Sequence, residues 1–179
     1  KLNLLFSLRL GAGYQPIGAM LCSSRIYDAI KHGSGFFQHV HTYIGHPVAT
    51  AAGLAVVTAL LDRGLIDKVK TMGDKLNLAL KKELGQHPNV GDIRGRGLFQ
   101  GIELVEDRET KKPFAPSLAI SKKIKDLAFS AGLICYPMSG TRDGINGDHI
   151  LLAPPYIIND SQIDEVVGKL SLSISQLTN

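Results

Sequence analysis

The spacing of apolar residues in the later two thirds of the chain predicts three helices. In each helix, apolar side chains recur every three or four positions and therefore lie along one face. The three segments are 66–84, 117–131 and 160–177. Gly132 is well placed to follow the end of the second helix in a left-handed conformation, and Asp160 is expected to be the N-cap of the third.

Short apolar runs between these helices predict strands. Residues 90–105 fit two strands joined by an Arg-Gly-Arg-Gly turn, and 133–136 and 149–153 fit one strand each. The segments that separate these elements are polar or rich in glycine and proline, which is typical of loops.

The first third of the chain has a different texture. A Gly-rich turn at Gly11–Pro16 separates two predicted strands. A loop over 32–45, rich in glycine, histidine and aromatic residues, then precedes a helix that is expected to begin at Pro47 and to continue through small residues to about Leu61. Small residues on that helix allow another backbone to approach closely.

The alternation of helices and strands predicts an α/β fold class. The break near Leu61–Gly64 is the predicted domain boundary, so that residues 1–62 form one part and residues 63–179 another. The second part is a compact α+β unit of ordinary domain size.

The composition narrows the classes of protein. Hydrophobic residues make up 44% of the 179 residues and charged residues 20%, which is enough apolar surface for a core and excludes wholesale disorder. No apolar run approaches the ~20 residues of a membrane-spanning helix. Two cysteines, Cys22 and Cys135, are too few for a disulfide framework, so an intracellular compartment, cytoplasmic or mitochondrial, is expected.

The formal net charge of +4 is compatible with an anionic ligand. Five lysines lie in the segment after Gly64, but they alternate with Asp67, Asp74 and Glu83. A solvated, salt-bridged helix face explains this pattern better than a nucleic-acid surface does.

The loop before Pro47 is a candidate ligand site. Thr42 offers a hydroxyl donor, and the start of the following helix offers N–H groups and the positive end of a dipole, which suits a phosphate. A packed interface loop is the alternative. His39, His41 and His46 also suggest a metal, but no acidic residue or cysteine accompanies them in the loop, so no metal site is predicted.

Two other loops contain arginine. The turn at 94–97 and Arg142, in a Gly-rich loop, both offer a guanidinium group that could hold a carboxylate or a phosphate in a bidentate pair. Solvated surface arginines are the alternative for both loops, and the preferred interpretation of the first. The spacing of Gly11–Pro16 alone likewise favours an ordinary tight turn over a cofactor-binding turn.

Four motifs together resemble the C-terminal part of a class III aminotransferase, a pyridoxal-phosphate enzyme of fold type I. Each motif is weak alone, but the four occur in the family's order and at plausible separations. The resemblance extends from about Leu10 to Leu177. The motifs are LGAGYQPIGA (10–19), HTYIGHPVA (41–49), RGRGLFQGIEL (94–104) and GDHILLAPP (147–155).

The resemblance implies a cofactor, a partner and a reaction. Thr42, with Tyr43 beside it, would bind the phosphate of pyridoxal 5'-phosphate across the interface of a homodimer. Gly11–Pro16 would lie beside the cofactor at that interface, and residues 1–62 would be the end of the large, cofactor-binding domain. Residues 63–179 would form the small C-terminal domain that closes over the substrate. The reaction would transfer an amino group to a 2-oxo acid or an aldehyde.

Two positions depart from the family pattern. The lysine that forms a Schiff base with the cofactor is expected three residues before Gly11, where this chain has Leu8. Leucine has no nitrogen, so no catalytic residue is assigned. Ornithine-type members have an arginine for the substrate carboxylate where this chain has Leu151, and Arg142 is the expected substitute.

Two functions follow. The first is a fragment of a class III aminotransferase, inactive or nearly so by itself, because Leu8 replaces the lysine and the larger N-terminal part of the fold is not in the sequence. The alternative is a non-catalytic, truncated homologue that acts as a dimerisation or binding module. Leu8 favours the alternative, and the phosphate-facing hydroxyl of Thr42 favours the enzyme.

Overall fold

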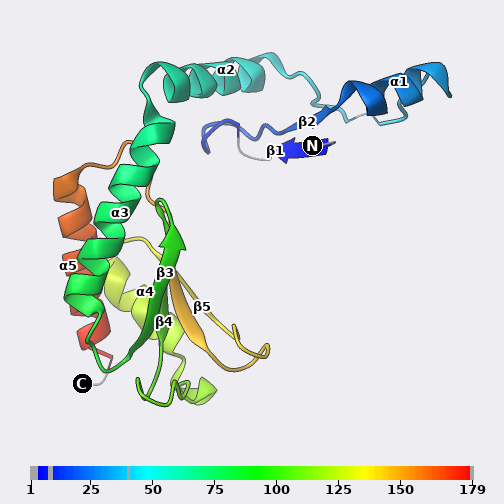
Figure 1. Cartoon of the computed structure of the whole chain (residues 1–179). Coiled ribbons are helices and arrows are strands. Elements are labelled where there is room, and N and C mark those ends of the chain that lie inside the picture. Colours follow the sequence, from blue (N-terminus) through cyan, green and yellow to red (C-terminus); the bar gives the residue numbers. More distant parts are fainter. Residues whose placement is uncertain (1–3, 8–9, 40, 178–179) are drawn as a thin grey trace. The chain divides into compact units, whose positions relative to one another are not determined.

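The chain divides into two compact units, Lys1–Gly64 and Leu65–Asn179 (Figure 1). The structure, a computed structural model, describes residues 4–7, 10–39 and 41–177. Leu8 lies outside the described residues. The assignment of 1–62 to a large domain and of 63–179 to a small domain stays a prediction.

The first unit combines a two-stranded hairpin with two helices. Strand β1 (Leu4–Ser7) pairs antiparallel with β2 (Ala19–Cys22), and helices α1 (Ser24–His32) and α2 (Pro47–Asp62) follow. The predicted helix that begins at Pro47 is thus confirmed. Within residues 10–39 and 41–64 of this unit, only three residues are buried, and all of them are small: Gly11, Ala49 and Gly53.

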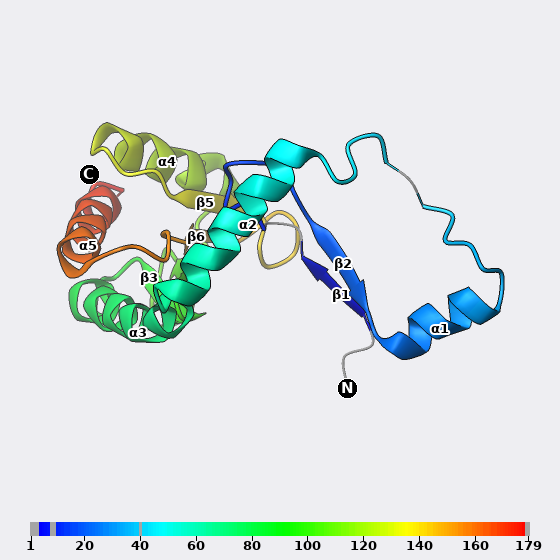
Figure 2. The ribbon, with the colours of Figure 1, turned by 90° about the horizontal axis from the view of Figure 1, so that it is seen from above.

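The second unit is a four-stranded antiparallel sheet covered by helices on one face. The sheet has the order β3-β4-β6-β5, and α3, α4 and α5 pack against the same face (Figures 1 and 2). The elements are α3 (Leu65–Leu84), β3 (Val90–Arg96), β4 (Phe99–Leu104), the 3-10 helix Pro116–Leu118, α4 (Ile120–Ser130), β5 (Tyr136–Ser139), β6 (Asp148–Leu152) and α5 (Asp160–Ser175).

The core of this unit lies between the sheet and the helices. Ile93, Ile102 and Ile150 are cross-strand neighbours and point to the helices, where all three are buried. The helices meet them with leucines and isoleucines at the spacing that the sequence predicts, of which Leu76, Leu80, Leu84, Ile124, Leu170 and Ile174 are fully buried. Ile66, the first apolar residue of the predicted stripe on α3, is an exception and is exposed.

The predicted strand at 133–136 is wrong, because the first part of this segment ends helix α4 instead. Gly132 has a φ of 76°, its N–H donates to the Phe129 carbonyl at 2.9 Å, and the Leu133 N–H donates to the Ala128 carbonyl at 2.8 Å. This pair of bonds is a Schellman motif, whose usual hydrophobic contact the buried Leu133 supplies. The role predicted for Gly132 is thereby confirmed, and the strand begins only at Tyr136.

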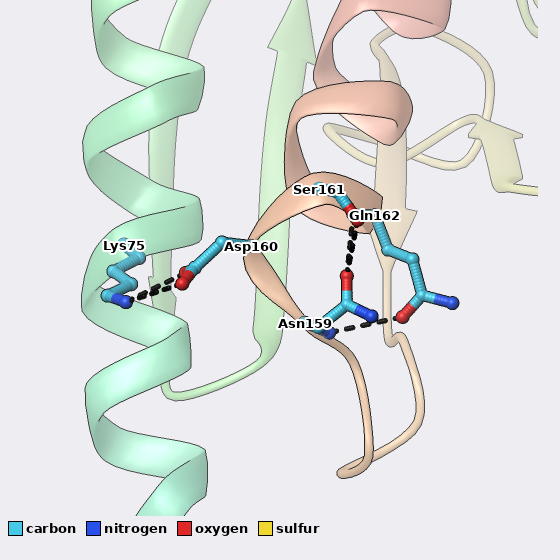
Figure 3. Close-up of polar contacts among 5 residues, drawn as sticks. All are labelled: Lys75, Asn159, Asp160, Ser161 and Gln162. Atoms are coloured by element: carbon cyan, nitrogen blue, oxygen red, sulfur yellow. Dashed lines mark hydrogen bonds and ion pairs between the residues drawn. The ribbon is translucent and has the colours of Figure 1, made fainter.

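The predicted N-cap of the last helix is also wrong by one residue. Asn159 caps α5, because its side chain accepts the Gln162 N–H at 3.0 Å while the Gln162 side chain accepts the Asn159 N–H at 3.1 Å (Figure 3). Asp160 instead forms an ion pair with Lys75 of α3 at 2.7 Å. The reciprocal cap contributes ~1 kcal/mol, and the exposed ion pair at most about the same.

Helix α3 touches the turn between β3 and β4 through two glycines. A Cβ atom on Gly73 would lie 2.2 Å from the carbonyl carbon of Gly97, which is closer than any real contact. Gly97 also has a φ of 55°, in the left-handed region that favours glycine. The second glycine of the Arg-Gly-Arg-Gly turn therefore has a structural purpose.

Within the described residues, no single helix has the length and hydropathy of a membrane span. Helices α2 and α3 meet that test only when they are counted together.

Candidate functional site

The Gly-rich turn after β1 is closed by its own backbone. The Leu10 N–H donates to the Ile17 carbonyl at 3.2 Å, and the Tyr14 N–H donates to the Gly11 carbonyl at 2.8 Å. A Cβ atom on Gly11 would lie 2.4 Å from the Gln15 carbonyl oxygen, and Gly13 has a φ of 87°. The turn itself thus requires both glycines, and its place beside a cofactor stays a prediction.

Thr42 and Tyr43 lie in two overlapping turns before α2. The Ile44 N–H donates to the His41 carbonyl at 2.9 Å, and the His46 N–H donates to the Tyr43 carbonyl at 3.1 Å. The side chains of Thr42 and Tyr43 are exposed, and the Thr42 hydroxyl makes no hydrogen bond to another described residue. This hydroxyl is available to a ligand.

The N-terminus of α2 offers less to a phosphate than the sequence suggests. Pro47 has no N–H, the Ala49 N–H donates to His46 Nδ1 at 3.5 Å, and the Thr50 N–H donates to the His46 carbonyl at 2.9 Å. Among these first positions only the Val48 N–H has no acceptor in the described part of the chain. The residues present therefore fit a phosphate through the Thr42 hydroxyl and, at the helix end, through the Val48 N–H.

Two of the three histidines of this loop accept hydrogen bonds from the backbone. His41 Nδ1 accepts the Tyr43 N–H at 3.2 Å, and His46 Nδ1 accepts the Ala49 N–H. Over the described ranges, no group of three histidine, cysteine or acidic residues has the geometry of a metal site.

Arg142 lies in the second unit, on a loop that is held by Asp143. The Asp143 carboxylate accepts the N–H groups of Ile145 and Asn146 at 2.9 and 2.7 Å and the Asn146 side-chain amide at 2.8 Å. These bonds, first those from Asn146, lower the pKa of Asp143 to about 2. The loop is therefore held by its own hydrogen bonds although it is exposed, and it carries the Arg142 guanidinium without an ion pair to any described residue.

Leu151 lies on the face of the sheet that the helices of its unit leave uncovered. It stands between Gly101 and Tyr136 in a cross-strand row, and Arg94 is the next residue beyond Gly101. Alternation along β6 places Leu151 opposite the buried Ile150 and Leu152. Sequence reasoning missed this row because strand register is not visible in one strand alone. Arg94, for which it preferred a solvated role, already pairs with Asp92 at 2.6 Å.

Comparison with known proteins covers almost the whole chain. The family model of class-III aminotransferases matches residues 4–174. An aminotransferase of Gibberella zeae is 42% identical over 166 residues, which are 92% of this chain and 32% of the relative. The chloroplastic gamma aminobutyrate transaminase 3 of Solanum lycopersicum is 33% identical, over 95% of this chain and 32% of that protein.

Solved structures agree. A transaminase from the marine bacterium Virgibacillus superposes with a TM-score of 0.89 at 33% identity, over 98% of this chain and 39% of that chain. A Bacillus anthracis aminotransferase gives a TM-score of 0.87 at 34% identity, over 97% of this chain and 39% of that chain. These matches confirm the predicted fold, with helix and sheet arranged as in part of a fold type I transaminase.

The chain spans about a third of the length of the relatives that it matches. Within that span, the family model matches residues 4–174, and the solved transaminase structures superpose on nearly the whole chain. The chain belongs to the class-III aminotransferase family.

Proposed function

We propose that this chain is the C-terminal part of an enzyme that transfers an amino group to a 2-oxo acid or an aldehyde through pyridoxal 5'-phosphate. The family match over residues 4–174 is the observation that carries the proposal. The chain would contribute a phosphate contact from its first unit and a substrate-binding arginine from its second.

Thr42 is the proposed contact to the cofactor phosphate, with Tyr43 beside it. The support is the exposed hydroxyl, which has no other partner among the described residues, in a turn that fixes its backbone. Bound pyridoxal phosphate supplies an electron sink for the amino-acid carbanion. The role proposed for this chain is to hold the phosphate group of the cofactor.

Arg142 is the proposed partner of the substrate carboxylate. Guanidinium and carboxylate form a bidentate, charge-assisted pair, and Arg142 has no competing ion pair in the described residues. The Asp143-centred loop presents it from a fixed backbone.

The chain alone is proposed to be catalytically incomplete. Leu8 offers a hydrocarbon where the family's lysine provides the amine that holds the cofactor and moves the proton. The matched relatives are about three times as long, so the groups that stack on the cofactor and pair with its ring nitrogen are expected outside this sequence.

A homodimer and an intracellular location, cytoplasmic or mitochondrial, complete the proposal. The apolar residues that α2 exposes support the dimer, because such a surface is normally covered by a partner. The two free cysteines support the reducing compartment.

The test joins the upstream part of the Gibberella zeae relative to this chain, with Leu8 or with Leu8→Lys. Amino transfer in a coupled assay is expected only for the lysine form. In that form Thr42→Ala should weaken cofactor binding tenfold or more, because a hydrogen bond to a charged group contributes ~1.5–3 kcal/mol, and Thr42→Ser should restore it. The unmodified 179-residue chain should give no stoichiometric adduct after borohydride reduction with pyridoxal phosphate.

A non-catalytic dimerisation or binding module is the second candidate, and Leu8 is the observation that favours it. If the chimera with Leu8→Lys has no activity although it is folded, while the 179-residue chain forms a dimer, this second function replaces the first.

A further inference from the structure

A groove of about 800 Å³ lies between α3 and β3 in the second unit. Gln100 lines it and is only 2% exposed; its side chain accepts a hydrogen bond from Asn77 at 2.8 Å and donates to the Gly97 carbonyl at 2.6 Å. These internal bonds hold Gln100 in place, and the groove is lined by apolar residues such as Ile66 and Val69 as well as by polar ones.

The walls of the groove are strongly positive. Lys70 and Lys81 on α3 and Arg96 on β3 line it, and none of the three forms an ion pair within the described residues. Arg94 lines it too but is neutralised by Asp92. Among the described lining residues, Asp74 is the one acidic side chain that faces these cations.

The groove also contains an unpaired strand edge. Strand β3 is the first strand of its sheet and pairs only with β4 among the described strands. Because the hairpin closes at Arg96 and Phe99, alternate residues of β3, including Ile93 and Gly95, direct their N–H and C=O groups away from β4. Asp92 accepts the Ile93 N–H at 2.8 Å, which leaves the Ile93 carbonyl and both backbone groups of Gly95 for a further strand.

Charged residues on an edge strand often serve only to prevent pairing. Here two of the cations, Lys70 and Lys81, are on α3, on the opposite side of the groove from that edge. They would flank an added strand rather than block it, and they would favour one that carries negative charge.

We propose that this groove binds an acidic peptide segment in extended conformation, which adds to β3 as a fifth strand of the sheet. The backbone of the segment would pair with Ile93 and Gly95, and its carboxylates would contact Lys70, Lys81 and Arg96. This mode combines main-chain hydrogen bonds for affinity with side-chain charge for selectivity. It is independent of the aminotransferase function.

The probe is an eight-residue peptide of alternating glutamate and threonine, labelled for fluorescence anisotropy and titrated with the 179-residue chain. Binding is expected for this peptide and not for the matched lysine–threonine peptide. The glutamate–threonine peptide N-methylated on alternate residues should bind at least tenfold more weakly, because methylation removes the strand-pairing N–H groups. Equal binding of the methylated peptide would refute strand addition.

A pair of charge reversals tests the location. Lys70→Glu with Lys81→Glu should weaken binding at least tenfold, whereas Lys123→Glu with Lys125→Glu, a matched change on the exposed face of α4, should change it less than twofold. All four lysines are exposed, so circular dichroism should confirm an intact fold in both variants. An equal loss of binding in both variants would mean that the peptide responds to the net charge of the chain and not to this groove. A single-stranded oligonucleotide of the same charge that bound more tightly at this groove would overturn the choice of a peptide.

Discussion

Most of the leucines are exposed on helix α2 but buried on helix α3, the next helix along the chain. Leu54 and Leu61 on α2 are 69% and 66% exposed, whereas Leu76 and Leu80 on α3 are fully buried. Helix α3 has one apolar stripe, which the sheet and α5 cover. Helix α2 is apolar on all sides, and the described residues of its own unit bury only Ala49 and Gly53 of it.

This difference separates a unit that completes its own core from one that does not. A helix that is apolar all round is stable in water only when neighbours cover more than one side. The second unit contains the apolar residues that cover its helices, and the first unit has no comparable set in its described residues. The comparison predicts that stability comes from residues 65–179 and self-association from residues 1–64.

Removal of residues 1–64 is the most severe test of the comparison. Residues 65–179 alone should be monomeric and unfold cooperatively, while the full chain should self-associate through its exposed apolar residues. Size-exclusion chromatography with light scattering and thermal unfolding measure both properties. Trypsin should cut the full chain first near Arg63 or within 106–116. A full chain that stayed monomeric at high concentration would contradict the comparison.

Matched leucine substitutions in α2 and α3 sharpen the comparison of the two units. Leu80→Ala should lower the free energy of unfolding by ~2–5 kcal/mol, because it leaves a cavity in a core. Leu54→Ala removes the same atoms from an exposed site and should change the free energy of unfolding by less than about 0.5 kcal/mol. Urea denaturation measures both. Similar losses for the two variants would mean that α2 is covered in solution.

Two glycines in helices of unit 2 provide a finer test of its packing. Gly73→Ala should destabilise by ~1–3 kcal/mol, because the added methyl group meets the backbone of Gly97. Gly168→Ala on α5 meets open space and should stabilise by ~0.5–1 kcal/mol through its helix propensity. Opposite signs of the two shifts in urea midpoint are the expected result. A neutral Gly73→Ala variant would show that α3 and the hairpin turn do not touch.

The smallest effect concerns pH. Burial raises the pKa of Asp148, which is 7% exposed, above the ordinary 3.8. The hydrogen bond that its carboxylate accepts from the Ser121 N–H at 3.3 Å opposes this shift. The folded state therefore holds this proton more tightly than the unfolded state does, and stability falls as pH rises from 3.8 through the raised pKa. Asp148→Asn should remove this fall. Urea midpoints from pH 3.5 to 7 test it, and a constant difference between the two proteins would contradict the assignment.

The sequence predicted most of the second unit because its signals are local. Helical stripes such as Leu76, Leu80 and Leu84 need only one helix to be recognised, and Gly132 marks a helix end by itself. The errors arose where two local explanations compete. Leu133 is as apolar as a strand residue but packs at a helix end, and Asp160 is as good a cap as Asn159 until Lys75 of another helix is seen to pair with it.

The candidate site was less predictable because it depends on partners across the fold. Thr42 and Arg142 were found through motif resemblance and chemistry, and their roles stay predictions. The hydrogen bond from the Ala49 N–H to His46 Nδ1 depends on a side-chain rotamer, and the row from Arg94 to Tyr136 depends on strand register. Neither is written in the local pattern of residues.

The Asp143-centred loop has a consequence for the entropy of binding. Ordering a mobile backbone costs ~1–2 kcal/mol for each residue, so a disordered loop of this length would weaken any ligand held by Arg142 severely. Here the Asp143 carboxylate holds Ile145 and Asn146, and the Arg142 N–H donates to the Asn146 carbonyl at 2.9 Å, so the backbone of the loop is bonded before a ligand arrives. An anion that binds Arg142 then has to order only the side chain itself, whose rotamers represent ~2 kcal/mol.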